Sequence, residues 1–176
     1  AGKFYSAYGN TAVRTNQYKN GLTYLKKSLD IYDSLQIPLK KAMVMLTICV
    51  AYEEMGEYDD ALFFGEKAFE LYKQNDARPE RLSMCYTNLG NVYSSMGRYD
   101  SALIYYNNSI AIDGKLGDSS GDSYGYTNIG WLHYEKEQFD SALKYFKLSA
   151  FIVSMYGSDF EKMISNHNYG NLLYDE

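Results

Sequence analysis

The 176-residue sequence has little of several features that define other classes of protein. Its two cysteines and two prolines exclude a small disulfide-held fold and a proline-rich linker. No uncharged run approaches the roughly 20 residues of a transmembrane helix, so we expect no direct membrane insertion by this segment. Lys and Arg number 17 against 22 Asp and Glu, without a basic stripe. Nucleic acid is therefore not an expected partner.

Residues and motifs of catalytic and metal sites are also scarce. There are only two histidines, and the sequence has no HExxH zinc-binding pattern. No phosphate-binding glycine loop or nucleophile elbow follows a strand, because no strand is predicted. The segment 118–122 lacks the alternating ligands and the closing Glu of a calcium loop, and we expect it to be a turn before a helix. We therefore expect no catalysis, no cofactor and no metal.

Tyrosine, by contrast, is abundant, with 20 copies, and such a bias can come from a repeated motif. Similar segments are centred on Gly9, Cys49, Gly90, Gly130 and Gly170, at steps of 40 or 41 residues. Each of the first four repeats has an aromatic residue, followed three positions later by a small residue and then directly by a leucine. The aromatic residues are Tyr18, Tyr58, Tyr99 and Phe139, the small residues are Gly21, Ala61, Ala102 and Ala142, and the leucines are Leu22, Leu62, Leu103 and Leu143. Spacings of 3, 4 and 7 place such residues on one helical face, so each repeat is predicted to contain two helices.

A short turn is predicted between the two helices of each repeat. Gly56 and Gly97 supply the backbone freedom that ends a helix, and Asn16 at the same position also tolerates a left-handed conformation. Glu137 occupies this position in the fourth repeat, so we expect that turn to close without a left-handed residue or in another way. Cys49 takes the place of an anchor glycine and is predicted to be buried.

These glycine, alanine and tyrosine positions resemble the tetratricopeptide repeat family over nearly the whole chain. The resemblance implies an all-α fold, a right-handed α-solenoid of tandem helix–turn–helix repeats. We expect one array over 1–176, with repeats at 3–41, 42–80, 83–121 and 123–160 and the first helix of a fifth at 161–176. The repeats exceed the usual 34 residues, and we expect the extra residues at the ends of the second helices and in connections holding Pro38 and Pro79. The unfinished fifth repeat predicts a piece of a longer protein.

The resemblance also implies a concave groove lined by the first helices, which binds a protein or an extended peptide. Asparagine recurs two residues before the anchor residue, at Asn88, Asn128 and Asn168. Polar or aromatic residues stand one position after the anchor, at Asn10, Asn91, Trp131 and Asn171. An amide can donate to and accept from one peptide unit, and the pattern resembles the asparagine ladder of O-linked N-acetylglucosamine transferase repeat arrays. Alternatively, these amides bond neighbouring helices and stiffen the stack.

Further residues complete the predicted peptide-binding groove. They form its floor or stand beside Trp131, at Thr87, Thr127 and His167, and at Tyr134 and Tyr174. His133 is predicted to be packed instead. Acidic side chains outnumber basic ones at the groove edge and favour a ligand with basic character. The predicted function is a non-catalytic scaffold, a sensor or adaptor module in signalling; the alternative is a homo-oligomer that self-associates through exposed ends such as Leu172 and Leu173.

Overall fold

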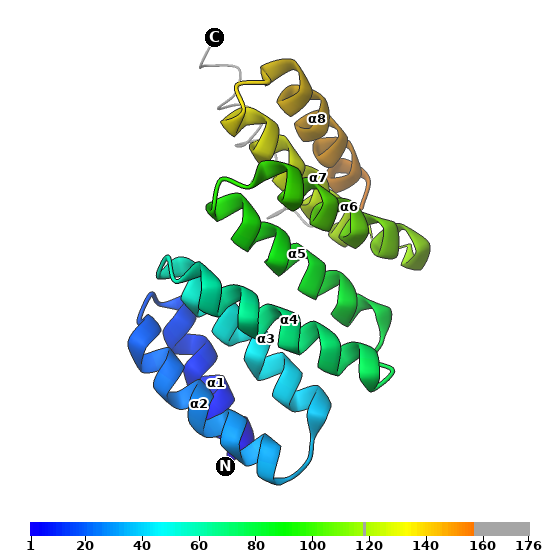
Figure 1. Ribbon diagram of the computed structural model, residues 1–176. Coiled ribbons are helices and arrows are strands. Elements are labelled where there is room, and N and C mark those ends of the chain that lie inside the picture. Colours follow the sequence, from blue (N-terminus) through cyan, green and yellow to red (C-terminus); the bar gives the residue numbers. More distant parts are fainter. Residues whose placement is uncertain (118, 157–176) are drawn as a thin grey trace. The chain divides into compact units, whose positions relative to one another are not determined.

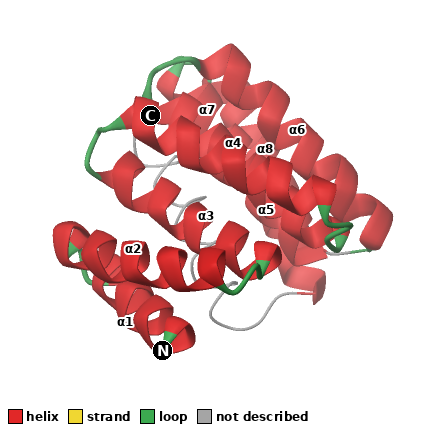
Figure 2. Ribbon diagram, turned by 60° about the horizontal axis from the view of Figure 1, so that its bottom comes forward, coloured by secondary structure: helices red, strands yellow, loops and turns green. Residues whose placement is uncertain are grey.

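The computed structural model describes residues 1–117 and 119–156, which form helices joined by short turns (Figure 2). Within these residues there are eight helices and no strands. They are α1 (Gly2–Arg14), α2 (Tyr18–Ser34), α3 (Pro38–Glu54), α4 (Tyr58–Gln74), α5 (Pro79–Ser95), α6 (Tyr99–Leu116), α7 (Ser119–Glu135) and α8 (Phe139–Tyr156). None of the described helices is both long and apolar enough to cross a membrane.

The helices fall into two compact units, residues 1–98 with α1 to α5 and residues 99–176 with α6 to α8. In the first unit α1 packs on α2 and α3 on α4 as hairpins, while α1, α3 and α5 contact one another in that order (Figure 1). In the second unit α7 packs on α8, and α6 packs on α7. This confirms the predicted all-α solenoid of tandem helix–turn–helix repeats.

The turns share one backbone feature, which is a residue in a left-handed conformation shortly before the next helix. Gly56, Gly97 and Asn16 adopt φ values of 74°, 70° and 59°, as their types predict. Glu137 also adopts a positive φ, 56°, so the expectation of a turn without a left-handed residue was wrong. The Gln138 amide then donates to the His133 carbonyl, as the equivalent amides do in the other turns. The hydrogen-bonded closure of the turn therefore outweighs the strain of about 1 to 3 kcal/mol that a left-handed backbone causes at Glu137.

The first helices of the second, third and fourth repeats start earlier than expected. Pro38 and Pro79 are the first residues of α3 and α5, and not parts of the connections. Proline suits the first helical position because its missing N–H has no intrahelical partner there. As a result α3, α5 and α7 each start four residues before the expected repeat starts at 42, 83 and 123. The residues beyond the usual repeat length therefore extend the helices, which reach 17 or 18 residues from α2 onward.

Each hairpin core is built on a close approach between a small and a large residue. A Cβ added to Gly9 would lie 2.6 Å from Leu25 Cγ, and one added to Gly130 would lie 2.6 Å from Phe146 Cε1. In the second repeat the sizes are exchanged, because Cys49 replaces the glycine and Gly65 stands where the other repeats have a large side chain. A Cβ on Gly65 would lie 3.1 Å from Cys49 Sγ. As predicted, Cys49 is fully buried.

A buried serine reinforces two of the hairpins. The Ser28 hydroxyl donates to the Gly2 carbonyl at 2.9 Å, and the Ser149 hydroxyl donates to the Ser123 carbonyl at 3.0 Å. Each bond joins the second helix to the first turn of the first helix. A buried carbonyl that is hydrogen-bonded avoids the cost of an unsatisfied polar group, so these bonds fix the register of the two helices.

The exchange of sizes between Cys49 and Gly65 can be tested by restoring the pattern of the other repeats. We expect Gly65→Leu alone to lower the free energy of unfolding by about 1 to 3 kcal/mol through overpacking. Cys49→Gly alone should cost about 1 to 2 kcal/mol through the lost side chain and the helical glycine. The double variant should recover at least about 1 kcal/mol relative to the sum, measured by urea unfolding. Cys85→Gly, another buried cysteine, is the matched control and should not rescue Gly65→Leu.

Candidate peptide-binding surface

In the second unit, α7 brings Asn128 and Trp131 onto one face, because residues three apart are neighbours on a helix. Asn128 is half-buried, and its side-chain amide has no hydrogen bond to any of the described residues. Trp131 keeps 37% of its surface exposed. An unpaired amide beside an exposed indole can offer hydrogen bonds and apolar area to the same ligand.

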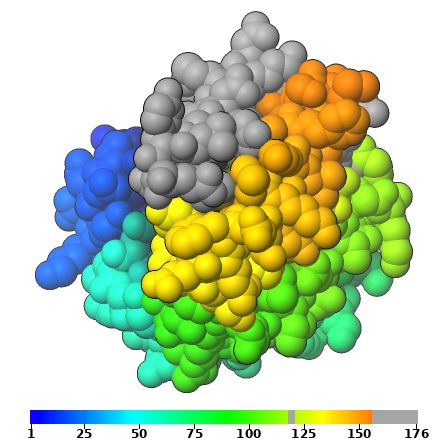
Figure 3. Space-filling view, turned by 90° about the horizontal axis from the view of Figure 1, so that it is seen from above, coloured from blue at the N-terminus to red at the C-terminus, as the bar shows by residue number. Residues whose placement is uncertain are grey.

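Trp131 is held in place by other aromatic rings. Its ring meets Phe146 of α8 edge to face at a centroid distance of 5.2 Å, and Tyr134 at 5.6 Å. Tyr134 in turn meets Phe139, also at 5.6 Å. Figure 3 shows the surfaces of α7 in yellow and α8 in orange side by side. The indole therefore contacts the neighbouring helix and is also partly exposed.

The two threonines that were predicted for the groove floor use their hydroxyls for hydrogen bonds within the fold. Thr127 Oγ1 lies 2.9 Å from the Ser123 carbonyl and 2.7 Å from Ser149 Oγ, so it joins α7 to α8. Thr87 donates to the Ser83 carbonyl of its own helix at 3.3 Å. Both side chains are half-buried. Their hydroxyls are engaged within the fold, which leaves the asparagines as the more accessible polar groups.

In the first unit the predicted asparagines differ in their surroundings. Asn88 on α5 donates from Nδ2 to the Met84 carbonyl of its own helix at 2.8 Å, and its Oδ1 is not used in that bond. Asn91, one turn later, is half-buried and also has side-chain interactions. Asn10 on α1 is half-buried, and its Oδ1 is shielded from solvent with no donor among the described residues. These amides thus lie on two first helices, α1 and α5, and are not equivalent.

Four predicted site residues lie outside the described residues, namely His167, Asn168, Asn171 and Tyr174. Leu172 and Leu173, expected at an exposed end, lie outside them too. His133 is half-buried, stacks on Tyr145 at 5.3 Å and places Nδ1 2.7 Å from Gln138 Oε1, in line with its predicted packing role. Within residues 1–117 and 119–156 no cluster of three His, Cys, Asp or Glu side chains could hold a metal ion.

Glu53 near the end of α3 is an electrostatic feature that the sequence pattern did not reveal. Burial and, to a smaller extent, the nearby Glu54 carboxylate raise the pKa of its carboxyl to about 7, although the Ser95 hydroxyl donates to Oε1 at 3.0 Å and opposes the shift. Glu53 therefore carries only part of a negative charge at neutral pH. The acidic excess expected at the groove edge is correspondingly smaller.

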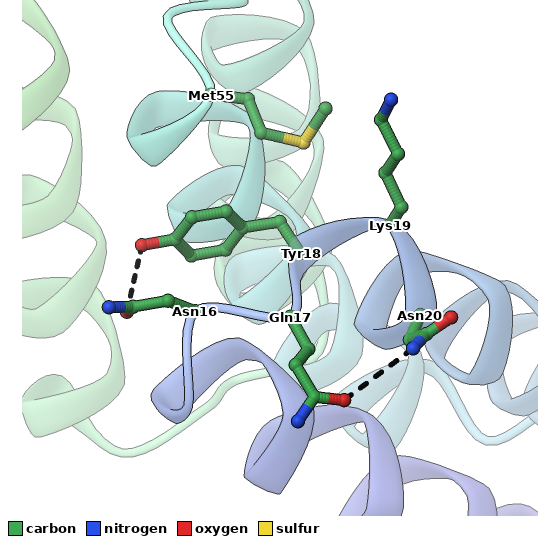
Figure 4. A pocket seen from close by; sticks show the side chains of 6 residues that line it. All are labelled: Asn16, Gln17, Tyr18, Lys19, Asn20 and Met55. Carbon is green, nitrogen blue, oxygen red and sulfur yellow. Dashed lines mark hydrogen bonds between the residues drawn. The ribbon is translucent and has the colours of Figure 1, made fainter.

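A separate pocket of about 360 Å³ lies at the turn between α1 and α2 (Figure 4). Its wall consists of side chains from this turn and from the end of α3, at Asn16, Gln17, Tyr18, Lys19, Asn20 and Met55. The Tyr18 hydroxyl lies 3.0 Å from Asn16 Oδ1 and 3.3 Å from Glu54 Oε2. None of the residues predicted to bind a ligand lines this pocket, and its wall is mostly exposed.

The raised pKa of Glu53 predicts how stability depends on pH. Between the ordinary pKa of 4.5 and the folded value of about 7, the folded state binds more protons than the unfolded state. The contribution of Glu53 to stability therefore falls as pH rises through this window. We expect Glu53→Gln, which can still accept from Ser95, to raise the free energy of unfolding at pH 8 and to change it little at pH 5.

Urea unfolding at the two pH values is the measurement, with Glu66→Gln on the exposed side of α4 as the matched control. The control should leave the pH dependence unchanged. An equal loss of stability in Glu53→Gln at both pH values would show that the ionised carboxylate is not disfavoured in the folded state.

Comparison with known proteins identifies the repeat. Residues 81–150 match the family model of the tetratricopeptide repeat. The fold is similar to that of a Rap protein complexed with competence and sporulation factor (14% identity, TM-score 0.83), aspartyl phosphate phosphatase F from Bacillus subtilis (16%, 0.86) and BtubC from P. vanneervenii (16%, 0.79). The alignments cover 96%, 98% and 96% of this chain, but 47%, 45% and 70% of those chains. Residues 81–150 thus match the tetratricopeptide repeat, and the fold of the chain is similar to that of tetratricopeptide-like repeat arrays, a fold that is typically a non-catalytic scaffold for protein interaction.

Proposed function

We propose that the chain binds an extended peptide segment of a partner protein on the exposed face of its first helices. The observation that carries the proposal is the pairing, on one face of α7, of the Asn128 amide, which has no hydrogen bond within residues 1–117 and 119–156, with the partly exposed ring of Trp131. Tryptophan is enriched among residues that dominate binding energy, because it buries a large area with few torsions. The amide adds a donor and an acceptor that suit a peptide backbone.

Two further features support a peptide rather than a small molecule. Trp131 and Asn128 lie on an open helix face, and the pocket in the first unit is lined by other residues. Small-molecule sites are usually concave and bury most of their ligand. An extended peptide instead gains affinity from successive contacts along a surface.

A neighbouring charge on α7 favours a ligand without excess negative charge. Glu135 at the end of this helix is exposed, and a strongly acidic peptide bound to the helix would meet repulsion from its carboxylate. We propose that the chain serves as a sensor or adaptor module of a larger protein, in which the bound peptide is the signal.

The test is a selection of peptides from a random display library against the purified chain. Selected peptides should bind with affinities that fall at least tenfold in Asn128→Ala and in Trp131→Ala, measured by fluorescence anisotropy of labelled peptide. Asn128 is half-buried and Trp131 contacts Phe146, so thermal melts establish that each variant is folded at the temperature of the binding measurement. Trp131→Phe should retain part of the affinity, because it keeps aromatic area.

Asn107→Ala on the exposed side of α6 is the matched control, and it should leave the affinity unchanged. The proposal fails if the library yields no binding peptide, or if selected peptides bind equally to the chain and to both variants. Loss of binding only in variants that also unfold would likewise count against a direct contact.

A further inference from the structure

One side of α8 carries three exposed apolar residues, which we call the outer face of α8. Leu148, Phe151 and Met155 keep 37%, 62% and 61% of their surface exposed. Their spacings of three and four residues place them on the same side of the helix over about two turns. Another side of α8 packs on α7, where the Ser149 hydroxyl donates to the Ser123 carbonyl. The outer face is therefore not part of the hairpin core.

The other second helices are also exposed at these positions, but their residues are polar or small. Each of those helices is followed by a first helix that packs on it, α2 by α3, α4 by α5 and α6 by α7. A first helix that packs in this way therefore leaves the outer positions open, and only their apolar chemistry is particular to α8. The equivalent residues are Lys27, Asp30 and Ser34 in α2, Lys67, Glu70 and Gln74 in α4, and Asn108, Ala111 and Lys115 in α6.

The charge of α8 also differs from that of the other second helices. Residues 141–156 include two lysines, Lys144 and Lys147, and no acidic residue, whereas the equivalent residues 20–35, 60–75 and 101–116 each include at least one acidic residue. Both lysines are exposed, and neither forms an ion pair with another residue that the structure describes. They precede Leu148 and Phe151 by one turn each. Their ammonium groups can therefore reach acidic groups of a partner that covers the outer face.

These features favour one helix of a partner protein over a second copy of the chain. A stable dimer takes about 800 Å² from each partner, much more than three partly exposed side chains provide. Pairing of two copies through this face would also bring four lysines together without acidic residues from 141–156. An amphipathic helix presents apolar residues at the same spacing as Leu148, Phe151 and Met155, so two such rows can pack along each other.

We propose that the outer face of α8 binds an amphipathic helix of a partner protein whose apolar stripe is bordered by acidic residues. The stripe packs on Phe151 and Met155, and the acidic residues pair with Lys144 and Lys147. Asn128 and Trp131 of α7 are not part of this surface. The inference therefore does not depend on the proposed binding of an extended peptide.

A displayed library of synthetic amphipathic helices is a suitable probe. Each member has about 18 residues, which is long enough for partial helicity in isolation. Its leucine stripe is fixed at i, i+3, i+4 and i+7, and its border positions carry Glu or Lys at random. After selection against the intact chain at low ionic strength, Glu should exceed Lys at the borders at least about twofold. Binding of a labelled Glu-bordered helix should weaken at about 1 M salt, where charges are screened over about 3 Å.

Variants of the intact chain locate the binding. Phe151→Ser with Met155→Ser should weaken binding of the Glu-bordered helix at least about tenfold, measured by fluorescence anisotropy, because the apolar contact is lost. Lys144→Glu with Lys147→Glu should instead reverse the preference, so that a Lys-bordered helix binds more tightly than a Glu-bordered one. These four side chains are exposed, and thermal melts establish that each variant is folded.

Equivalent changes on other second helices are the matched controls. Glu70→Ser on α4 alters the position that corresponds to Phe151. Lys26→Glu with Lys27→Glu on α2 changes the net charge by the same amount as the double lysine variant of α8. Both controls should keep the preference for Glu-bordered helices. NMR titration of the labelled chain should place the largest shifts at amides of α8.

Three outcomes of the binding experiments overturn the proposal. They are a library that yields no binding helix, unchanged binding in both α8 variants, and equal use of Glu and Lys at the borders of the selected helices. Loss of binding in a folded Trp131→Ala variant would also overturn it, because the helices would then use the proposed peptide surface on α7.

Two further outcomes would assign the outer face to a different occupant and so contradict the proposal. Self-association of the chain alone that Phe151→Ser with Met155→Ser abolishes would assign it to a second copy, and analytical ultracentrifugation detects this. Sedimentation with vesicles of phosphatidylcholine and phosphatidylserine that either α8 variant abolishes would assign it to a lipid surface. We expect the chain to show neither behaviour.

Discussion

The structure depends on how closely the two helices of each hairpin approach each other. Gly9 faces Leu25 and Gly130 faces Phe146, so that the large side chain fills the space left by the missing Cβ. The second repeat meets the same constraint in reverse, with Cys49 opposite Gly65. The repeats therefore preserve the summed volume of the two facing side chains, as expected for protein interiors that are packed at nearly crystalline density. All the faces that could bind a ligand are positioned by this contact.

The same helices present two kinds of surface. One face of α3 and α5, with Val44, Ile48 and Leu89, is apolar and packs on the second helix of the preceding hairpin. The face with Asn128 and Trp131 is polar and aromatic, and it is not used for stacking within the described residues. Because the second face belongs to a rigid helix, a ligand on it would be held by side chains that the fold has already ordered. Binding then carries a smaller entropic cost than it would on a mobile loop.

Sequence reasoning succeeded where one residue type has one physical role. The helical periodicity, the left-handed turn glycines and the burial of Cys49 follow directly from spacing and size. It failed where tertiary context overrides local preference, as at Glu137, whose left-handed backbone is imposed by the turn, and at Pro38, whose place at a helix start was assigned to a connection. The raised pKa of Glu53 and the engagement of Thr127 by Ser149 require partners about 20 to 40 residues away, which periodicity does not identify. For the site, it treated as equivalent several amides that the structure distinguishes.

The uniform turns have a consequence for how such a chain can change its length. From α2 onward, helices start at 18, 38, 58, 79, 99, 119 and 139, so the backbone repeats after 20 or 21 residues while the side-chain chemistry repeats after about 40. A single helix with its turn could be inserted without disturbing the path of the main chain. It would, however, exchange the roles of all helices that follow, so that polar faces would enter the stack and small-residue faces would meet solvent. We therefore expect helices to be gained or lost in pairs during evolution, although the turns by themselves would also accept a single helix.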